Sequence, residues 1–276
     1  MRTVAFADGT TVPALGQGSW MMGEHHARRA EEIAALREGI ALGLTVIDTA
    51  EMYADGEAER VVGEAIAGQR DAVFLVSKAY PQNASRARLA RACEASLARL
   101  GTDRIDLYLL HWRGSVALAE TVAAMEALVA AGKILRWGVS NLDRADMVEL
   151  VDSGGAACAT DQILYNLTRR GPEHDLLPWL AAQGMPVMAY SPVEQGRLLR
   201  DAALARIAAA RGVSPARVAL AWLLARGDVI AIPKAASIAH VRDNRGAADL
   251  SLTAAELAAL DRAFPPPRAP VPLEML

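Results

Sequence analysis

The stretch TVIDTAEMYADGEAERVVGEAIAGQRDAVFLVSK, residues 45–78, contains two short apolar runs, at 45–49 and 73–78. Between them, apolar residues recur at the three- and four-residue spacing that is typical of a helix. The same strand-then-helix unit recurs from Leu15 onward. The other strand candidates are 15–20, 106–111, 137–141, 159–164, 186–190 and 229–233. Repeated units of this kind favour parallel strands with right-handed crossovers, and eight such strands can close into a barrel.

The length of the chain agrees with one such barrel. A (β/α)8 TIM barrel typically has about 250 residues, this chain has 276, and no linker divides it. We therefore predict a single α/β domain over 1–276. An N-terminal β-hairpin is predicted around Asp8-Gly9, with a type I′ turn. Extra C-terminal helices are predicted from Ser214-Pro215 and over 253–264. Glycines that suit helix C-caps stand at Gly43, Gly101, Gly132 and Gly184.

The main alternative fold is a doubly wound nucleotide-binding sheet, which requires a G-x-G-x-x-G turn after its first strand. Gly16 and Gly18 are present, but Met21 stands where the third glycine is needed. No phosphate-binding loop of the Walker type occurs either. A nucleotide would have to be held in another way.

The amino-acid composition indicates which kinds of molecule this protein binds. The net charge is −3, with no long run of either sign, so we expect neither nucleic acid nor a membrane surface as a partner. We find no secretory signal and no stretch of ~18 apolar residues, and we expect a cytoplasmic monomer that binds small molecules. Cys93 and Cys158 are expected to be reduced and inert. His25-His26 lacks further ligands at metal-binding spacing, which favours a solvated loop and no metal site.

Ionisable side chains end three consecutive strand candidates: Asp48, Lys78 and His111. Each alone has an ordinary explanation, as a turn cap, a solvated strand end or a core histidine. The carboxyl ends of barrel strands form the active site in this fold, so the three together indicate a site. Tyr53, in the loop after Asp48, lies within reach of the same mouth.

These four side chains suit proton delivery. We expect the Lys78 ammonium to lower the pKa of Tyr53, which then gives its proton to a nascent alkoxide. Asp48 would fix Lys78, and a neutral His111 would orient a substrate carbonyl. Lys78 is the one plausible covalent nucleophile, so the co-reactant is expected to be a hydride donor.

Five motifs resemble the aldo-keto reductases, from Leu15 to about Phe264. They are VIDTAEMY at 46–53, LVSK at 75–78, LYLLHW at 107–112, GVSN at 138–141 and IPK at 232–234. The resemblance implies that Asp48, Tyr53, Lys78 and His111 form the catalytic tetrad. It is closest to short bacterial members that reduce methylglyoxal and related small aldehydes and ketones with NADPH.

The resemblance also implies the cofactor contacts. Ser140, Asn141 and Gln162 would hold the carboxamide, and Tyr190 would stack on the nicotinamide. The segment covering the pyrophosphate would include Ser191, Pro192, Gly196 and Leu198. Lys234 and Ser237 would bind the 2′-phosphate, and Asn244 the adenine; Trp20 and His240 complete the expected set.

Three positions depart from the family pattern. His240 replaces a common arginine and Ala235 a frequent serine, so NADH is also possible as the cofactor. Asp161 replaces a usual asparagine, and the sequence gives no physical reason for this change. The tail 265–276 is short, which implies an open, shallow site lined by Trp20, Met52, Tyr53, His111 and Trp112.

Two other functions remain open on the sequence. A Schiff-base lyase would use Lys78 as its imine-forming amine, as lysines at barrel strand ends often do. A non-catalytic binding module that carries a cofactor is the third hypothesis.

Overall fold

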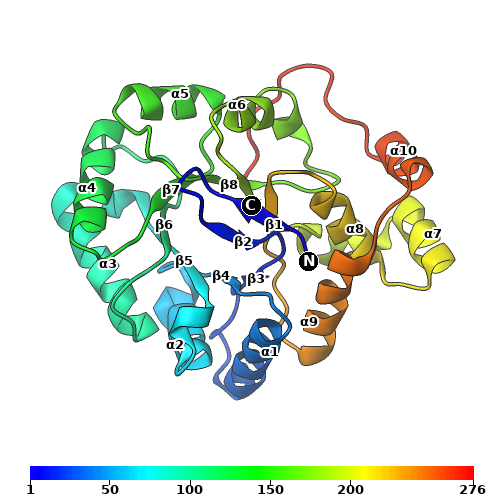
Figure 1. The fold of residues 1–276 in the computed structure, drawn as a ribbon, viewed down its shortest axis with the longest axis horizontal. Helices are drawn as coiled ribbons and strands as arrows, with labels where there is room; N and C mark the ends of the chain where they lie inside the picture. The colour runs from blue at the N-terminus through cyan, green and yellow to red at the C-terminus, as the bar shows by residue number, and fades with distance from the viewer.

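The computed structural model describes residues 1–276 and has a barrel of parallel strands at its centre (Figure 1). The eight barrel strands are β3 (Gln17–Gly18), β4 (Val46–Asp48), β5 (Phe74–Ala79), β6 (Leu107–Leu110), β7 (Trp137–Ser140), β8 (Asp161–Leu164), β9 (Val187–Tyr190) and β10 (Val229–Ala231). They are hydrogen-bonded in chain order from β3 to β10. Parallel bridges from Leu15 to Ala231 and from Gly18 to Lys234 close the ring. The predicted (β/α)8 barrel is therefore confirmed.

Helices surround the barrel (Figure 1). They are α1 (Arg29–Ala41), α2 (Glu57–Ile66), α3 (Arg86–Leu100), α4 (Leu118–Ala130), α5 (Arg144–Asp152), α6 (Leu176–Ala182), α7 (Ala202–Arg211), α8 (Pro215–Leu224), α9 (Ile238–Arg245) and α10 (Ala254–Ala263). The two predicted extra helices are present: α8, whose Ser214 N-cap accepts from the Arg217 N–H, and α10, which contacts α7 at one side of the molecule. After α10 the chain arches back toward the barrel axis, where it ends (Figure 1).

The predicted strand positions and helix ends agree with the structure. Each barrel strand lies within, or one residue beyond, its predicted range. Gly43, Gly101, Gly132 and Gly184 all have positive φ, as left-handed residues at helix ends do. The predicted C-terminal helix is α10, which begins with a capping box between Thr253 and Glu256.

The hairpin is confirmed but its turn is not type I′. Strands β1 (Thr3–Ala5) and β2 (Thr11–Pro13) are antiparallel. A type I′ turn needs positive φ at both Asp8 and Gly9, and only Gly9 has it. The Gly9 N–H donates to the Phe6 carbonyl at 3.0 Å, which fits a three-residue loop that ends in a left-handed glycine. Thr10 N–H donates to Asp8 Oδ1 at 2.9 Å, so the Asp8 side chain stabilises this longer loop.

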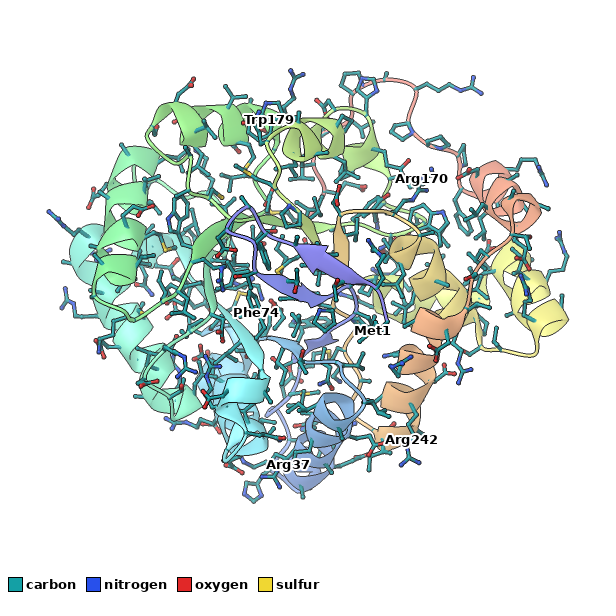
Figure 2. The ribbon with its side chains drawn as sticks, viewed as in Figure 1. Met1, Arg37, Phe74, Arg170, Trp179 and Arg242 are labelled. Atoms are coloured by element: carbon teal, nitrogen blue, oxygen red, sulfur yellow. The ribbon has the colours of Figure 1, made fainter.

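The hairpin covers the amino-terminal end of the barrel. Its Val4, Phe6 and Val12 pack with interior strand residues such as Val76. Figure 2 shows Phe74 near the centre of the view beside the hairpin, while Arg37 and Arg242 lie at the periphery. One end of the barrel is thereby closed by apolar side chains.

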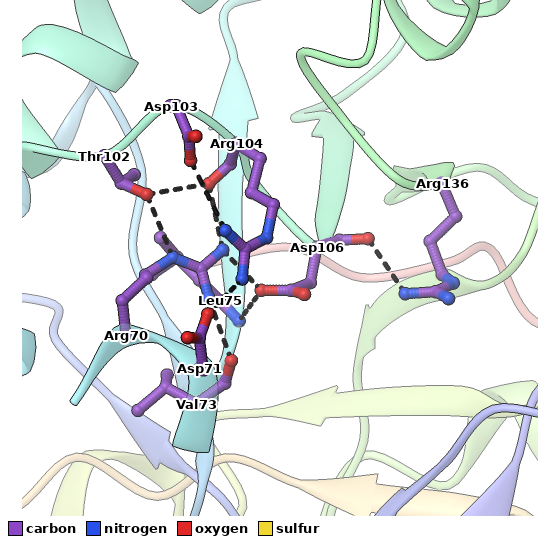
Figure 3. A network of polar contacts seen from close by, with 9 residues as sticks. All are labelled: Arg70, Asp71, Val73, Leu75, Thr102, Asp103, Arg104, Asp106 and Arg136. Carbon is purple, nitrogen blue, oxygen red and sulfur yellow. Dashed lines mark hydrogen bonds and ion pairs between the residues drawn. The ribbon is translucent and has the colours of Figure 1, made fainter.

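Arginine side chains fasten this closed end. Arg136 pairs with Asp8 of the hairpin at 2.9 Å and donates to the Asp106 carbonyl at 3.1 Å. Asp106 in turn accepts from Arg70 at 2.6 Å and from the Leu75 N–H at 2.9 Å (Figure 3). The network joins the hairpin to the starts of β5, β6 and β7.

Strand residues alternate between the barrel interior and the helical layer. Val46, Val76 and Leu109 face the interior, whereas Ile47 and Leu75 pack against the helices. Residues two positions further along each interior row, at the carboxyl ends, therefore face the open mouth of the barrel. Asp48, Lys78 and His111 occupy these positions, and the phase of each strand thus brings them together.

No single helix reaches the length and hydropathy that a bilayer crossing requires; only α7 and α8 taken together do, and they are bent by 95° at their junction. Cys93 and Cys158 are both buried and unbonded. Burial raises the pKa of each thiol to about 12, in agreement with the prediction that they are inert.

Candidate active site

A cavity of about 670 Å³ opens at the carboxyl ends of the strands. Fourteen of the predicted site residues line it: Trp20, Asp48, Met52, Tyr53, His111, Trp112, Ser140, Asn141, Gln162, Tyr190, Ser191, Pro192, Gly196 and Lys234. Seven lining residues were not predicted: Gly18, Met21, Val193, Gln195, Ile232, Met275 and Leu276. The volume is typical of a small-molecule site.

Lys78 connects the acidic and phenolic members of the site. Its fully buried ammonium donates to Asp48 Oδ2 at 2.7 Å, to the Thr49 carbonyl at 2.9 Å and to Tyr53 Oη at 3.1 Å. The two charged side chains pair because β4 and β5 are neighbours, with Asp48 opposite Val76. The predicted contact between the Tyr53 phenol and the Lys78 ammonium is therefore present.

The expected fall in the pKa of Tyr53 is not found. Burial raises the pKa of Tyr53 above its ordinary value, and the attraction of Lys78 offsets only part of that rise. Burial also acts to lower the pKa of Lys78, but Asp48 and Tyr53 outweigh it and the net shift is upward. Tyr53 thus holds its proton and Lys78 stays charged at neutral pH.

His111 lies beside the phenol as a neutral imidazole. Its ring centroid is 5.8 Å from that of Tyr53, with an interplanar angle of 73°. Burial, together with the charge of Lys78, lowers the pKa of His111 to about 3. Its buried Nδ1 has no hydrogen-bond partner. The ring can therefore serve as a neutral hydrogen-bonding group at the cavity wall.

The residues expected to hold a carboxamide form one hydrogen-bonded chain with the tetrad. Gln162 Nε2 donates to Asp48 Oδ1 at 2.7 Å, and Ser140 Oγ donates to the Gln162 carbonyl at 2.8 Å. Asn141 Nδ2 donates to the His111 carbonyl at 3.1 Å, and Tyr190 Oη donates to Asn141 Oδ1 at 2.9 Å. Amide groups thus stand ordered at the cavity floor.

Lys234 forms no direct ion pair, although Glu24, Glu31 and Glu32 act on its charge from further away. Its side chain is partly buried and lines the cavity wall. Burial, and next the nearby Arg28, lower the pKa of Lys234. An anionic ligand would relieve this unpaired position.

The other residues predicted for the adenosine end lie outside the cavity. Ser237 caps the start of α9, where its Oγ accepts from the His240 N–H at 3.4 Å. His240 is exposed, and Asn244 lies further along the same helix. Leu198 is buried in the core and does not line the cavity.

The backbone around the cavity is strained. Seven non-glycine residues have positive φ, and all lie in loops at the open mouth: Met21, Ala54, Asp55, Asn141, Ser191, Glu194 and Gln195. Ala54 and Asp55 follow Tyr53 directly and precede Gly56, at φ 89°. Such conformations cost about 1–3 kcal/mol each and persist only where the surroundings hold them.

A buried ion pair holds the loop after Tyr53. Glu59 is fully buried and accepts from Arg99 Nε at 2.5 Å and from Ser77 Oγ at 2.6 Å. Arg99 packs so closely on Gly56 that a Cβ there would lie 2.6 Å from Arg99 Cδ. Because Ser77 precedes Lys78, this pair links the Tyr53 loop to the strand that carries the lysine.

The tail reaches the cavity, contrary to what its short length implied. Met275 and Leu276 line it. Leu273 packs on the core, and Glu274 forms an ion pair with Arg169. These long-range contacts leave no local pattern in a proline-rich segment, which explains why the sequence did not predict them.

Asp161 lies behind the site. Since Gln162 faces the cavity, its neighbour on β8 faces the helical layer, where it is fully buried. Neither carboxyl oxygen of Asp161 has a hydrogen-bond partner. Burial raises the pKa of Asp161 well above its ordinary value, so the folded carboxyl keeps its proton to a higher pH than a free one.

Comparison with known proteins assigns the class. Residues 14–264 match the model of the Aldo/keto reductase family. The chain belongs to this family and is an oxidoreductase.

Individual relatives cover all or nearly all of the chain. It is 57% identical over 281 residues to the methylglyoxal reductase YeaE of Escherichia coli, covering 100% of this chain and 99% of the relative. It is 31% identical to the methylglyoxal reductase DkgB of Salmonella typhimurium, over 91% of this chain and 94% of the relative. An aldo-keto reductase from Klebsiella pneumoniae, crystallised with NADPH, is 56% identical with a TM-score of 0.98, covering 100% of this chain and 99% of that one.

Proposed function

We propose that this enzyme reduces small aldehydes and ketones of the methylglyoxal type to alcohols, with NADPH as the hydride donor and Tyr53 as the general acid. The contact that carries the proposal is the 3.1 Å hydrogen bond from the buried Lys78 Nζ to Oη of Tyr53, which lines the cavity. The relatives named as methylglyoxal reductases and the NADPH complex of a relative support the substrate and cofactor classes.

NADPH fits the donor set of the cavity. The amides of Asn141 and Gln162 suit a carboxamide, and Lys234, a cation at the cavity wall without a direct ion pair, suits a phosphate dianion. NADPH, when bound, supplies a hydride to the carbonyl carbon of the substrate. The protein has to orient that carbonyl and deliver a proton to its oxygen.

The tetrad accounts for the proton transfer. Tyr53 donates its phenolic proton to the oxygen as negative charge develops there, and the Lys78 ammonium stabilises the phenolate that remains. Asp48 keeps Lys78 charged and in place. His111 is neutral and hydrogen-bonds the substrate oxygen without competing for the proton. Trp20, Met52 and Trp112 provide apolar surface for a small carbon skeleton.

The same contacts disfavour a Schiff-base lyase. Imine formation needs an accessible, neutral amine. Lys78 is fully buried, its ammonium donates to three oxygens, and its pKa is raised. We therefore expect no trapping of a carbonyl substrate on Lys78 by borohydride.

The test compares Tyr53→Phe with the wild-type enzyme. Loss of a general acid typically lowers the rate about 10²- to 10⁴-fold, while NADPH binding, measured by fluorescence, should remain. Tyr165→Phe is the matched control, because it removes a buried hydroxyl that donates to Glu173 outside the cavity. Full activity in Tyr53→Phe would exclude the phenol as the acid. Tight NADPH binding without turnover of any aldehyde by the wild type would indicate a binding module.

A further inference from the structure

The buried carboxylate of Glu194 holds the loop 191–200, which follows β9. Glu194 is only 4% exposed. It accepts from Asn166 Nδ2 at 2.8 Å, from Arg169 Nη2 at 2.8 Å and from Arg197 Nη2 at 3.1 Å. Asn166 also donates to the Ser191 carbonyl at 2.9 Å. The cavity-lining part of this loop thus depends on contacts to residues 166–169.

The tail 265–276 contacts Arg169 and the nearby Gly171. Glu274 pairs with Arg169, and a Cβ on Gly171 would lie 2.6 Å from Val271 Cγ2. The next two residues, Met275 and Leu276, line the cavity. The tail is therefore positioned where it can touch a bound carbonyl compound.

Arg169 is the one side chain that binds both segments. Its Nε and Nη2 donate to Glu194 at 3.1 and 2.8 Å, while its Nη1 donates to Glu274. A planar guanidinium cannot turn toward one carboxylate without changing its geometry to the other. A displacement of the loop therefore changes the ion pair between Arg169 and Glu274 of the tail, and a displacement of the tail changes the contact between Arg169 and Glu194 of the loop.

We propose that Arg169 is a positioning residue that couples two parts of the site. One is the loop 191–200, which covers the cofactor, and the other is the end of the tail, Met275 and Leu276, which contacts the carbonyl substrate. Arg169 itself does not line the cavity. The proposal rests on the proposed function for the identity of the two ligands. Ordering of the loop by NADPH then orders Met275 and Leu276, and by linkage the tail strengthens NADPH binding in turn.

The test uses Glu274→Gln, which loosens the tail without touching the loop, and Glu94→Gln as the matched control. Glu94 pairs with Lys133 at 2.9 Å on the surface, with an exposure of 56% against 49% for Glu274. We expect Glu274→Gln to speed amide hydrogen exchange within 191–200 and to raise the Kd for NADPH, each about two- to fivefold, the range for one partly exposed ion pair. Glu94→Gln should change neither.

A second comparison separates coupling from simple destabilisation. Arg169→Met should speed exchange in both segments, and adding Glu274→Gln to it should have no further effect on the loop. If Glu274→Gln loosens only the tail, or if the two substitutions act additively, the coupling is refuted. If the wild type binds no NADPH, the proposed function fails, while the exchange comparison on the protein alone still decides the coupling.

Discussion

Replacing Gly56 by alanine tests whether the ion pair behind Tyr53 holds the catalytic loop. Gly56 has φ 89°, so any Cβ there is strained. The new methyl carbon would also lie 2.6 Å from Arg99 Cδ and 2.7 Å from Arg99 Nε. Arg99 cannot move away freely, because the fully buried Glu59 holds its Nε at 2.5 Å.

Gly68→Ala is the matched control, since Gly68 lies just beyond the other end of α2 with φ 79° and no atom within 4 Å of its Cβ position. In both variants the left-handed backbone of the new alanine destabilises the protein by about 1 kcal/mol. In Gly56→Ala, overpacking against Arg99 destabilises it by about 1–3 kcal/mol more. We therefore expect the free energy of unfolding to fall by about 1 kcal/mol in Gly68→Ala and by about 2–4 kcal/mol in Gly56→Ala.

Urea unfolding followed by circular dichroism measures these losses, and steady-state NADPH oxidation at 25 °C measures activity. Because Gly56 ends the turn that begins at Tyr53, kcat should fall in Gly56→Ala and stay unchanged in Gly68→Ala. Equal losses of stability in the two variants, with equal kcat, would show that Arg99 yields freely and does not fix the loop.

Three further predictions follow from charge and burial. The His111 imidazole, whose pKa is lowered to about 3, should show no titration by NMR between pH 5 and 8; a midpoint near its ordinary value would contradict its burial beside Lys78. Asp161→Asn should stabilise the protein more at pH 8 than at pH 4 in urea unfolding. Because its pKa is raised, the folded carboxyl keeps its proton to a higher pH than the unfolded one, so the wild type loses stability as pH rises above the unfolded pKa; an equal effect at both pH values would refute this reasoning. Lys234→Met should raise the Kd for NADPH about tenfold or more in fluorescence titrations, because a charged hydrogen bond is lost, and should raise the Kd for NADH less. An equal rise for both cofactors would show that Lys234 does not bind the 2′-phosphate.

The sequence predicted the barrel and the tetrad from local patterns, whereas the residues expected to hold the cofactor came from the resemblance to a known family. The alternation within each strand determines which side chain faces the interior, so Asp48, Lys78 and His111 could be placed at one mouth before any coordinates were known. Helix ends at Gly101 and Gly132 were equally local, since each needs only one left-handed residue.

Features that depend on distant contacts were missed or misjudged. Met275 and Leu276 reach the cavity through Arg169, about a hundred residues away in the chain. The pKa of Tyr53 was expected to fall because proximity to Lys78 can be inferred from motifs, whereas the depth of burial that outweighs it cannot. Asp161 became interpretable only once its side of β8 was seen to face the helices.

The left-handed residues at the open mouth also bear on how this enzyme can be altered. At about 1–3 kcal/mol each, seven such residues represent conformational energy comparable to the whole margin of folding of a typical domain. Glycine substitutions there would relieve the backbone strain and raise the melting temperature, but they would also make the loops at the open mouth more mobile. Efforts to stabilise the enzyme should therefore begin at the hairpin, because none of its residues lines the cavity.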